Sequence, residues 1–188
     1  MEREYIDDGV RTRLIIAGIS ELEEHGIKDF SLRRAALSAQ VSCAAPYRHF
    51  KDKDEFITEI IKYVVSKWEL LCREIIRVFS NDKRRLIVEI AVASVRFWLA
   101  NPNFRSVIAL VPVGAEMGAA LASFDASLNL VIEDYLSECN LLNLKEQKQY
   151  TIRAVIYGTV MLIGRGEIAN SEETFAFLRK KIEEEFSF

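Results

Sequence analysis

The sequence has 188 residues, half of them hydrophobic, which is enough for a sizeable core in one domain or in one domain with a small appendage. Charged residues make up 28% of the chain and the formal net charge is −3, so the composition excludes a disordered chain and a protein that is basic overall. Three widely spaced cysteines and two histidines exclude a disulfide framework and show no zinc-ligand spacing, so we expect no metal and no cofactor. The N-terminus lacks a signal-peptide pattern and no apolar run reaches the roughly 20 residues of a membrane span, so we expect a cytoplasmic protein without a membrane contact.

The first quarter of the chain predicts three short helices. Helical periodicity runs from about residue 10 to residue 25, and Gly26 follows as a left-handed stop. Ser31 is a good N-cap for a second helix and Ser42 for a third, with a turn over residues 39–41 between them. This layout is typical of a helix-turn-helix that reads DNA.

The rest of the chain predicts a large helical body. Asp52 and Glu55 have capping-box spacing and open a fourth helix toward Phe79. Asp82, Asn143 and Asn170 are the expected caps of later helices. The expected ranges are 83–101, 103–110, 115–142, 144–165 and 171–186. We therefore predict an all-α chain of about nine helices. Its expected parts are a DNA-binding domain over residues 1–53 and a regulatory domain for ligand binding and dimerisation over residues 54–188.

The third predicted helix carries residues suited to DNA. Between residues 28 and 53, six basic and two acidic side chains give a local excess of +4, whereas the rest of the chain sums to −7. In a helix-turn-helix the second helix enters the major groove, and Arg48 offers a fork for guanine or phosphate. Lys53 starts the fourth helix, where its charge and the free N–H groups can face one phosphate.

This order of residues resembles the tetracycline-repressor (TetR) family of bacterial transcription regulators over about residues 10–57. The residues that carry the resemblance are Leu14, Ile15, Ala17, Leu22, Gly26, Phe30, Ser31, Leu32, Ala36, Val41, Ser42, Tyr47, Arg48, His49, Phe50, Lys53 and Phe56. The resemblance implies that Tyr47 and Lys53 hold phosphates. It also implies that other residues of the helix-turn-helix, which we call the reading head, face bases or nearby phosphates. The candidate DNA-binding residues are Ser31, Arg33, Ser42, Cys43, Ala44, Ala45, Tyr47, Arg48, His49 and Lys53. Two departures are Gln40, where the family usually has glycine, and Gly18, where it usually has alanine.

The resemblance also implies a pocket for a small-molecule effector in the body, for which an apolar or aromatic compound is favoured. The candidate ligand-binding residues are Trp68, Phe97, Trp98, Phe104, Met117, Tyr135, Tyr157 and Met161, with plain core packing as the alternative. The family forms dimers through its last two helices. The candidate dimerisation residues are Val155, Leu162, Phe175, Leu178 and Ile182, and the alternative is that this stripe packs inside one chain. The helix over residues 144–165 is apolar nearly all round after Arg153, so we expect burial on more than one side.

These patterns predict a homodimeric repressor that a small ligand releases from a palindromic DNA operator. One alternative is a helical enzyme or lipid carrier that uses the apolar body, although the chain contains no phosphate loop, dinucleotide fingerprint or hydrolase motif. Another is an interaction module whose helix-turn-helix no longer reads DNA.

Overall fold

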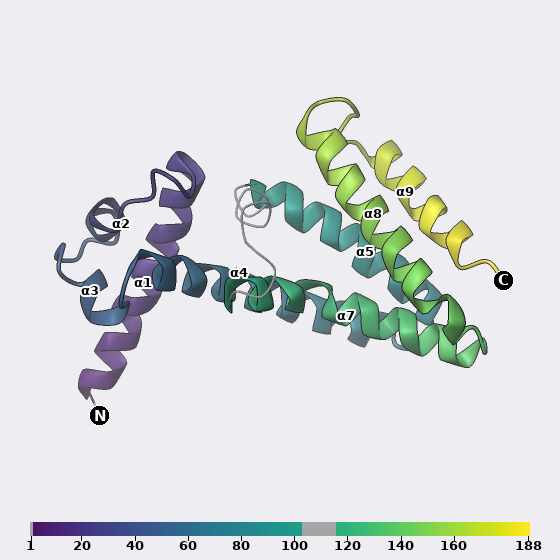
Figure 1. Ribbon diagram of the computed structural model, residues 1–188, viewed down its shortest axis with the longest axis horizontal. Coiled ribbons are helices and arrows are strands. Elements are labelled where there is room, and N and C mark those ends of the chain that lie inside the picture. Colours follow the sequence, from purple (N-terminus) through teal and green to yellow (C-terminus); the bar gives the residue numbers. More distant parts are fainter. Residues whose placement is uncertain (1, 103–115) are drawn as a thin grey trace. The chain divides into compact units, whose positions relative to one another are not determined.

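A computed structural model describes the backbone of residues 2–102 and 116–188, and the side chains of residues 9–102 and 123–188. Every regular element in these ranges is helical (Figure 1), which confirms the all-α prediction. The α-helices are α1 (Glu2–His25), α2 (Leu32–Ser38), α3 (Pro46–His49), α4 (Lys53–Phe79), α5 (Lys83–Ala100), α7 (Glu116–Glu138), α8 (Lys145–Gly164) and α9 (Glu172–Glu185), with a 3-10 turn at Leu142–Leu144. The short helix predicted over residues 103–110 lies outside the described residues.

The chain divides into two compact units. Among the described residues, the first comprises residues 2–67 and 116–121, and the second comprises residues 68–102 and 122–188. The division falls inside α4, so this one continuous helix contributes to both units. In the part of the chain that the structure describes, none of the helices combines the length and the apolar character that a membrane crossing requires.

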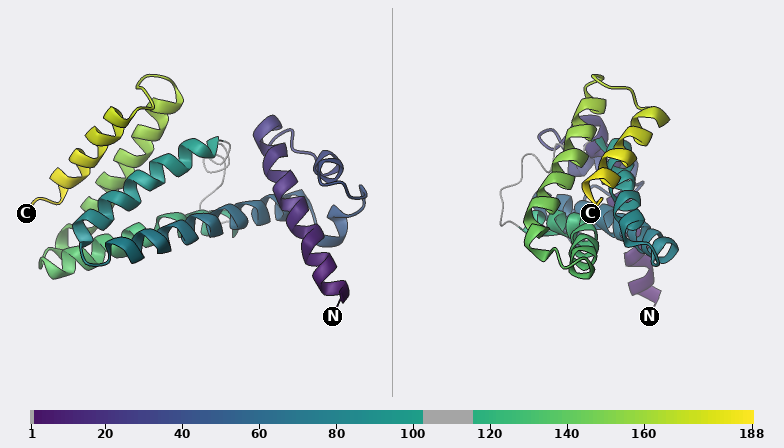
Figure 2. Two further views of the ribbon diagram at one scale, coloured as in Figure 1. Left: turned by 180° about the vertical axis from the view of Figure 1, so that it is seen from behind. Right: turned by 90° about the vertical axis from the view of Figure 1, so that its right-hand side faces the viewer.

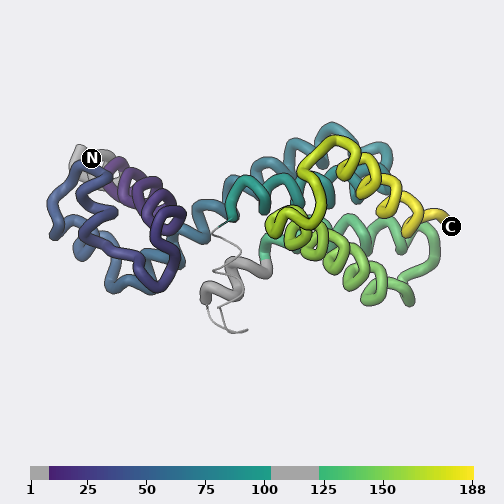
Figure 3. Tube along the Cα trace, turned by 90° about the horizontal axis from the view of Figure 1, so that it is seen from above, coloured from purple at the N-terminus to yellow at the C-terminus, as the bar shows by residue number. Residues whose placement is uncertain are grey.

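The first unit packs α1 against α2 and α3, and its chain path can be followed in Figure 3. Its core includes Phe50 and Phe56, whose rings stack with centroids 4.2 Å apart, while Phe30 meets Phe56 edge-on at 5.5 Å. Gly26 has φ +69° and ends α1 as predicted, because a left-handed residue stops the helix.

Local capping residues were predicted well at some helix starts and missed by a few positions at others. The hydroxyl of Ser31 accepts the Arg34 N–H, and a carboxylate oxygen of Asp82 accepts the N–H three residues on at 2.9 Å, as expected. The prediction for Asn143 was wrong, because this residue lies inside the 3-10 turn and Leu144 occupies the N-cap of α8. The prediction for Asn170 was displaced by one residue, because the hydroxyl of Ser171 accepts the N–H of the third helical residue at 3.3 Å.

In the second unit, α5 packs against both α8 and α9 (Figure 2). Helix α8 buries Ile152, Ile156 and Val160, which share one side of the helix. The expectation that α8 is buried on more than one side is therefore wrong for a single chain, since Met161 is 53% exposed and Leu162 is 40% exposed.

Candidate nucleic-acid interface

Helices α2 and α3 are joined by the tight turn that the sequence predicts. The N–H of Val41 donates to the carbonyl of Ala36 at 3.0 Å, which closes the end of α2. Gln40 adopts φ +56°, the left-handed conformation that favours glycine and costs another residue about 1 kcal/mol. The chain therefore has glutamine, where the family usually has glycine, at a position with a strained backbone, and the fold tolerates this strain.

Helix α3 is shorter than predicted, because it starts at Pro46 and not after Ser42. A helix capped by Ser42 would need the N–H of residue 46 to donate to the Ser42 carbonyl, and proline has no N–H. That carbonyl instead accepts the Ala45 N–H at 2.8 Å, and the Ala45 carbonyl accepts the Arg48 N–H at 3.0 Å. The reading segment is therefore a turn over residues 42–45 followed by one helical turn, and the prediction of Ser42 as the helix cap was wrong.

Most of the candidate DNA-binding side chains are accessible. The exposed ones are Arg33, Ser42, Cys43, Ala44, Tyr47 and Arg48, while Ser31, His49 and Lys53 are half-buried. Tyr47 is 67% exposed, so its ring and hydroxyl are accessible to a partner outside the chain. Ala45 is only 1% exposed, so its side chain belongs to the core of the head and the prediction that it faces DNA was wrong.

Lys53 lies at the start of α4, as expected. Its ammonium donates to the carbonyl of Lys28 at 3.2 Å and lies 5.9 Å from the centroid of the Phe30 ring. Asp52 caps the helix by accepting the Glu55 N–H at 2.8 Å. The charge of Lys53 thus stands beside the first N–H groups of a long helix, a combination that attracts phosphate.

The structure adds a residue that sequence reasoning missed. Glu21, on α1, is 6% exposed, and its carboxylate accepts the Ser31 N–H at 3.0 Å and the Arg34 Nε–H at 2.8 Å. The hydrogen bond with Glu21 raises the pKa of Arg34. Arg34 therefore binds Glu21 and stabilises the packing of α2 against α1. Unlike Arg33, it is not available to contact DNA. The available signal was an acidic residue on the apolar face of the first helix, which needs a basic partner.

In the second unit, four of the eight candidate ligand-binding residues gather in one aromatic cluster. Trp68 stacks on Phe124 with centroids 4.4 Å apart, Trp98 meets Phe124 at 4.4 Å, and Phe97 and Tyr157 complete the group at distances up to 6.3 Å. We call these five residues the aromatic cluster.

The other candidate ligand-binding residues do not join this cluster. Tyr135 contacts Phe186 near the C-terminus, with ring centroids 5.8 Å apart, and Met161 is exposed on α8. Phe104 and the side chain of Met117 lie outside the described residues.

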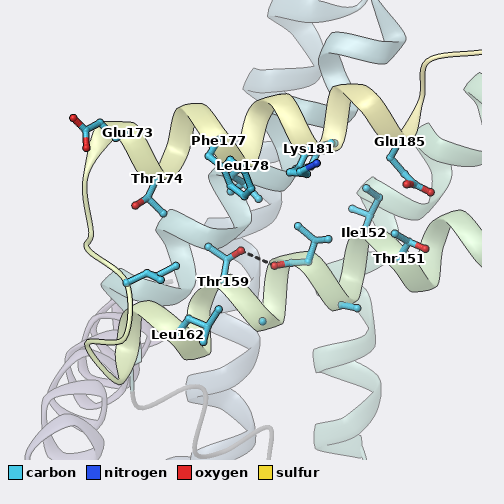
Figure 4. A pocket seen from close by; sticks show the side chains of 15 residues that line it. Thr151, Ile152, Thr159, Leu162, Glu173, Thr174, Phe177, Leu178, Lys181 and Glu185 are labelled. Atoms are coloured by element: carbon cyan, nitrogen blue, oxygen red, sulfur yellow. Dashed lines mark hydrogen bonds between the residues drawn. The ribbon is translucent and has the colours of Figure 1, made fainter.

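An apolar groove of about 700 Å³ runs between α8 and α9 (Figure 4). Val155 and Leu162 line it, as does Phe177, which is 62% exposed and was not among the predicted residues. The predicted stripe on α9 behaves differently. Phe175, Leu178 and Ile182 are at most 4% exposed, so they are largely covered inside one chain, which is the alternative that the sequence left open, although Leu178 and Ile182 also line the groove.

We compared the chain with protein-family models, with curated protein sequences and with solved structures. No family model matches the chain, and no curated protein has a significantly similar sequence. Solved structures do match over nearly the whole length. A putative TetR-family transcriptional regulator from Rhodococcus sp. is 16% identical with a TM-score of 0.71, covering 96% of this chain and all of the other. A protein of unknown function from Rhodococcus sp. RHA1 is 20% identical with a TM-score of 0.74, covering 93% and 94%. The transcriptional regulator FadR from Bacillus subtilis, in complex with stearoyl-CoA, is 12% identical with a TM-score of 0.69, covering 92% and 95%. The chain therefore has the fold of TetR-type regulators, as its resemblance implied.

Proposed function

We propose that the protein is a sequence-specific DNA-binding transcription regulator, a homodimeric repressor that a small apolar molecule releases from a palindromic operator. Residues 1–53 form its reading domain and residues 54–188 its regulatory domain. The observation that carries the proposal is the helix-turn-helix with exposed Tyr47, Arg48 and Arg33 around its turn.

The reading head supplies both kinds of contact that DNA recognition needs. Tyr47 and Lys53 hold backbone phosphates, which set the register of the head on the duplex. Arg33 and Arg48 reach base edges or nearby phosphates, and the small side chains of Cys43 and Ala44 allow the backbone to approach the bases.

The aromatic cluster supports an apolar effector in the second unit. It concentrates large rings between α4, α5, α7 and α8, and one structural neighbour was solved with stearoyl-CoA, a long-chain ligand. Trp68 belongs to α4, whose first residue is Lys53. A ligand that displaces Trp68 would therefore move the helix that begins at the proposed phosphate contact.

A second copy of the chain is the proposed occupant of the groove between α8 and α9. The side chains of Met161, Leu162 and Phe177 are apolar and exposed in a single chain, and a two-fold interface at this groove would remove them from water. Sedimentation velocity of Phe177→Asp, with Leu130→Asp as the control, tests this assignment. Leu130 is 66% exposed but lies outside the groove. Only Phe177→Asp should produce monomers, and equal behaviour of the two variants would exclude the groove as the interface.

Selection of binding sites from a random duplex-DNA pool by the full chain tests DNA reading. We expect a palindromic motif, and we expect Tyr47→Ala, a substitution at an exposed position, to lose the enrichment while remaining folded. No enrichment by the folded wild-type protein would overturn the proposal and favour the interaction-module alternative.

A further inference from the structure

Trp98 carries a buried hydrogen-bond donor that no described residue of the chain pairs with. Its side chain is 2% exposed, and its indole Nε1 has no hydrogen-bond partner among the described residues. A buried N–H without a partner is destabilising, and proteins seldom keep one without a reason.

The second indole of the aromatic cluster shows that the fold can satisfy such a group. Trp68 is buried to the same degree, and its Nε1 donates to the carbonyl of Phe124 at 2.8 Å. The two tryptophans contact the same phenyl ring, yet only one of them has its N–H paired. Trp98 is therefore the donor that remains available to a molecule entering the cluster.

The surroundings of Trp98 indicate the chemistry of that molecule. The rings of Phe97, Phe124 and Tyr157 lie within 6.3 Å of its ring, so the body of the ligand meets aromatic surfaces. Burial of the hydroxyl and the negative charge of Asp125 raise the pKa of Tyr157 to about 12. The charged groups next to Tyr157 are Asp125 and Arg153, whose Nε lies 3.1 Å from the Asp125 carboxylate. These two charges compensate each other and give no preference for an anion.

We propose that the effector is a neutral molecule with a flat apolar body and a carbonyl oxygen that accepts a hydrogen bond from Nε1 of Trp98. The proposal rests on the effector binding proposed above and specifies its chemical class. Trp98 is the residue that separates carbonyl compounds from hydrocarbons of the same shape, because a hydrocarbon leaves the N–H unpaired.

A matched pair of probes tests the inference. Isothermal titration calorimetry with the full chain compares 2-acetylnaphthalene with 2-isopropenylnaphthalene, in which a C=CH2 group replaces the C=O group and the shape is nearly the same. We expect the ketone to bind about 10-fold more tightly, as one hydrogen bond to an otherwise unpaired donor implies. Trp98→Phe, which keeps a ring but removes the N–H, should abolish this preference. Trp68→Phe is the control, since the N–H it removes is already paired, and the preference should persist.

Equal affinities of the two probes for the wild-type protein would overturn the inference, and so would a preference that survives in Trp98→Phe. If that variant fails to fold, as judged by circular dichroism, the comparison of the two probes on the wild-type protein still decides. Binding of neither probe would also overturn it. The selection experiment with duplex DNA fails or succeeds independently, so a wrong effector class is distinguishable from a protein that does not bind DNA.

Discussion

Replacing Glu21 by alanine should loosen the helix-turn-helix without removing any side chain that is proposed to contact DNA. The carboxylate is 6% exposed and joins α1 to the start of α2 through the Ser31 N–H and the Arg34 guanidinium. The Arg34 side chain is 45% exposed, so water screens that ion pair and the main loss is the Ser31 hydrogen bond to a charged acceptor. Such a bond contributes about 1.5–3 kcal/mol, and we expect Glu21→Ala to lower the free energy of opening of α2 by about 2 kcal/mol.

Hydrogen–deuterium exchange of the amides in α2 measures this opening directly. A loss of about 2 kcal/mol corresponds to exchange roughly 30-fold faster. Glu21→Gln keeps an oxygen acceptor for Ser31 and should change exchange far less. Glu24→Ala is the control, because Glu24 is 73% exposed on the same helix. If α2 exchanges no faster in Glu21→Ala than in Glu24→Ala, the carboxylate does not hold α2 and the reasoning is refuted.

Three further predictions follow from single contacts. A Cβ on Gly18 would lie 2.6 Å from Cδ1 of Ile60 and 3.2 Å from Cζ of Phe56, so Gly18→Ala should destabilise the wild-type protein by about 1–3 kcal/mol. The cost should be smaller beside Ile60→Val, which removes Cδ1, and additive effects in urea unfolding would contradict this. Burial raises the pKa of Asp125 above its unfolded value, so the folded state disfavours the carboxylate and loses stability as the pH rises through the folded pKa. Asp125→Asn should therefore raise the melting temperature at pH 7, with a gain that shrinks toward acid pH; a constant gain would exclude titration of Asp125 as the cause. Lys53→Ala should lower the slope of log affinity against log salt by about 1 for any duplex, whereas an unchanged slope would argue against a phosphate contact.

The features that could be predicted from sequence depend on residues close together in the chain. Gly26 ends α1, Ser31 caps α2, and Asp52 with Glu55 opens α4, because each involves a backbone group within a few residues. The errors at Ser42 and Asn143 arise where several adjacent polar or small residues could serve. At Ser42 the deciding signal lay four residues further on, because Pro46 has no N–H to donate to the Ser42 carbonyl, and the capping pattern alone does not take this into account.

The features that could not be predicted depend on which distant segment covers a residue. Ala45 and Ala44 look alike in sequence, yet one is buried in the head and the other is exposed. The pairing of Glu21 with Arg34 spans 13 positions and depends on how α1 and α2 cross. Likewise, composition predicted an aromatic body, but only the fold shows that Trp98 joins the aromatic cluster and Tyr135 does not.

In helix α8 the apolar pattern of the sequence predicts more burial than a single chain provides. Its residues after Arg153 are apolar nearly all round, but one chain buries only one side of the helix. Gly158, which lines the groove, is exposed, and a Cβ built on it would meet nothing within 4 Å. Nothing in the described part of a single chain therefore requires a glycine in this helix, where glycine costs about 1 kcal/mol relative to alanine. A second helix backbone that approaches closely at Gly158 would account for both the missing side chain and the exposed apolar surface of Met161 and Leu162, and a second copy of the chain can supply that helix.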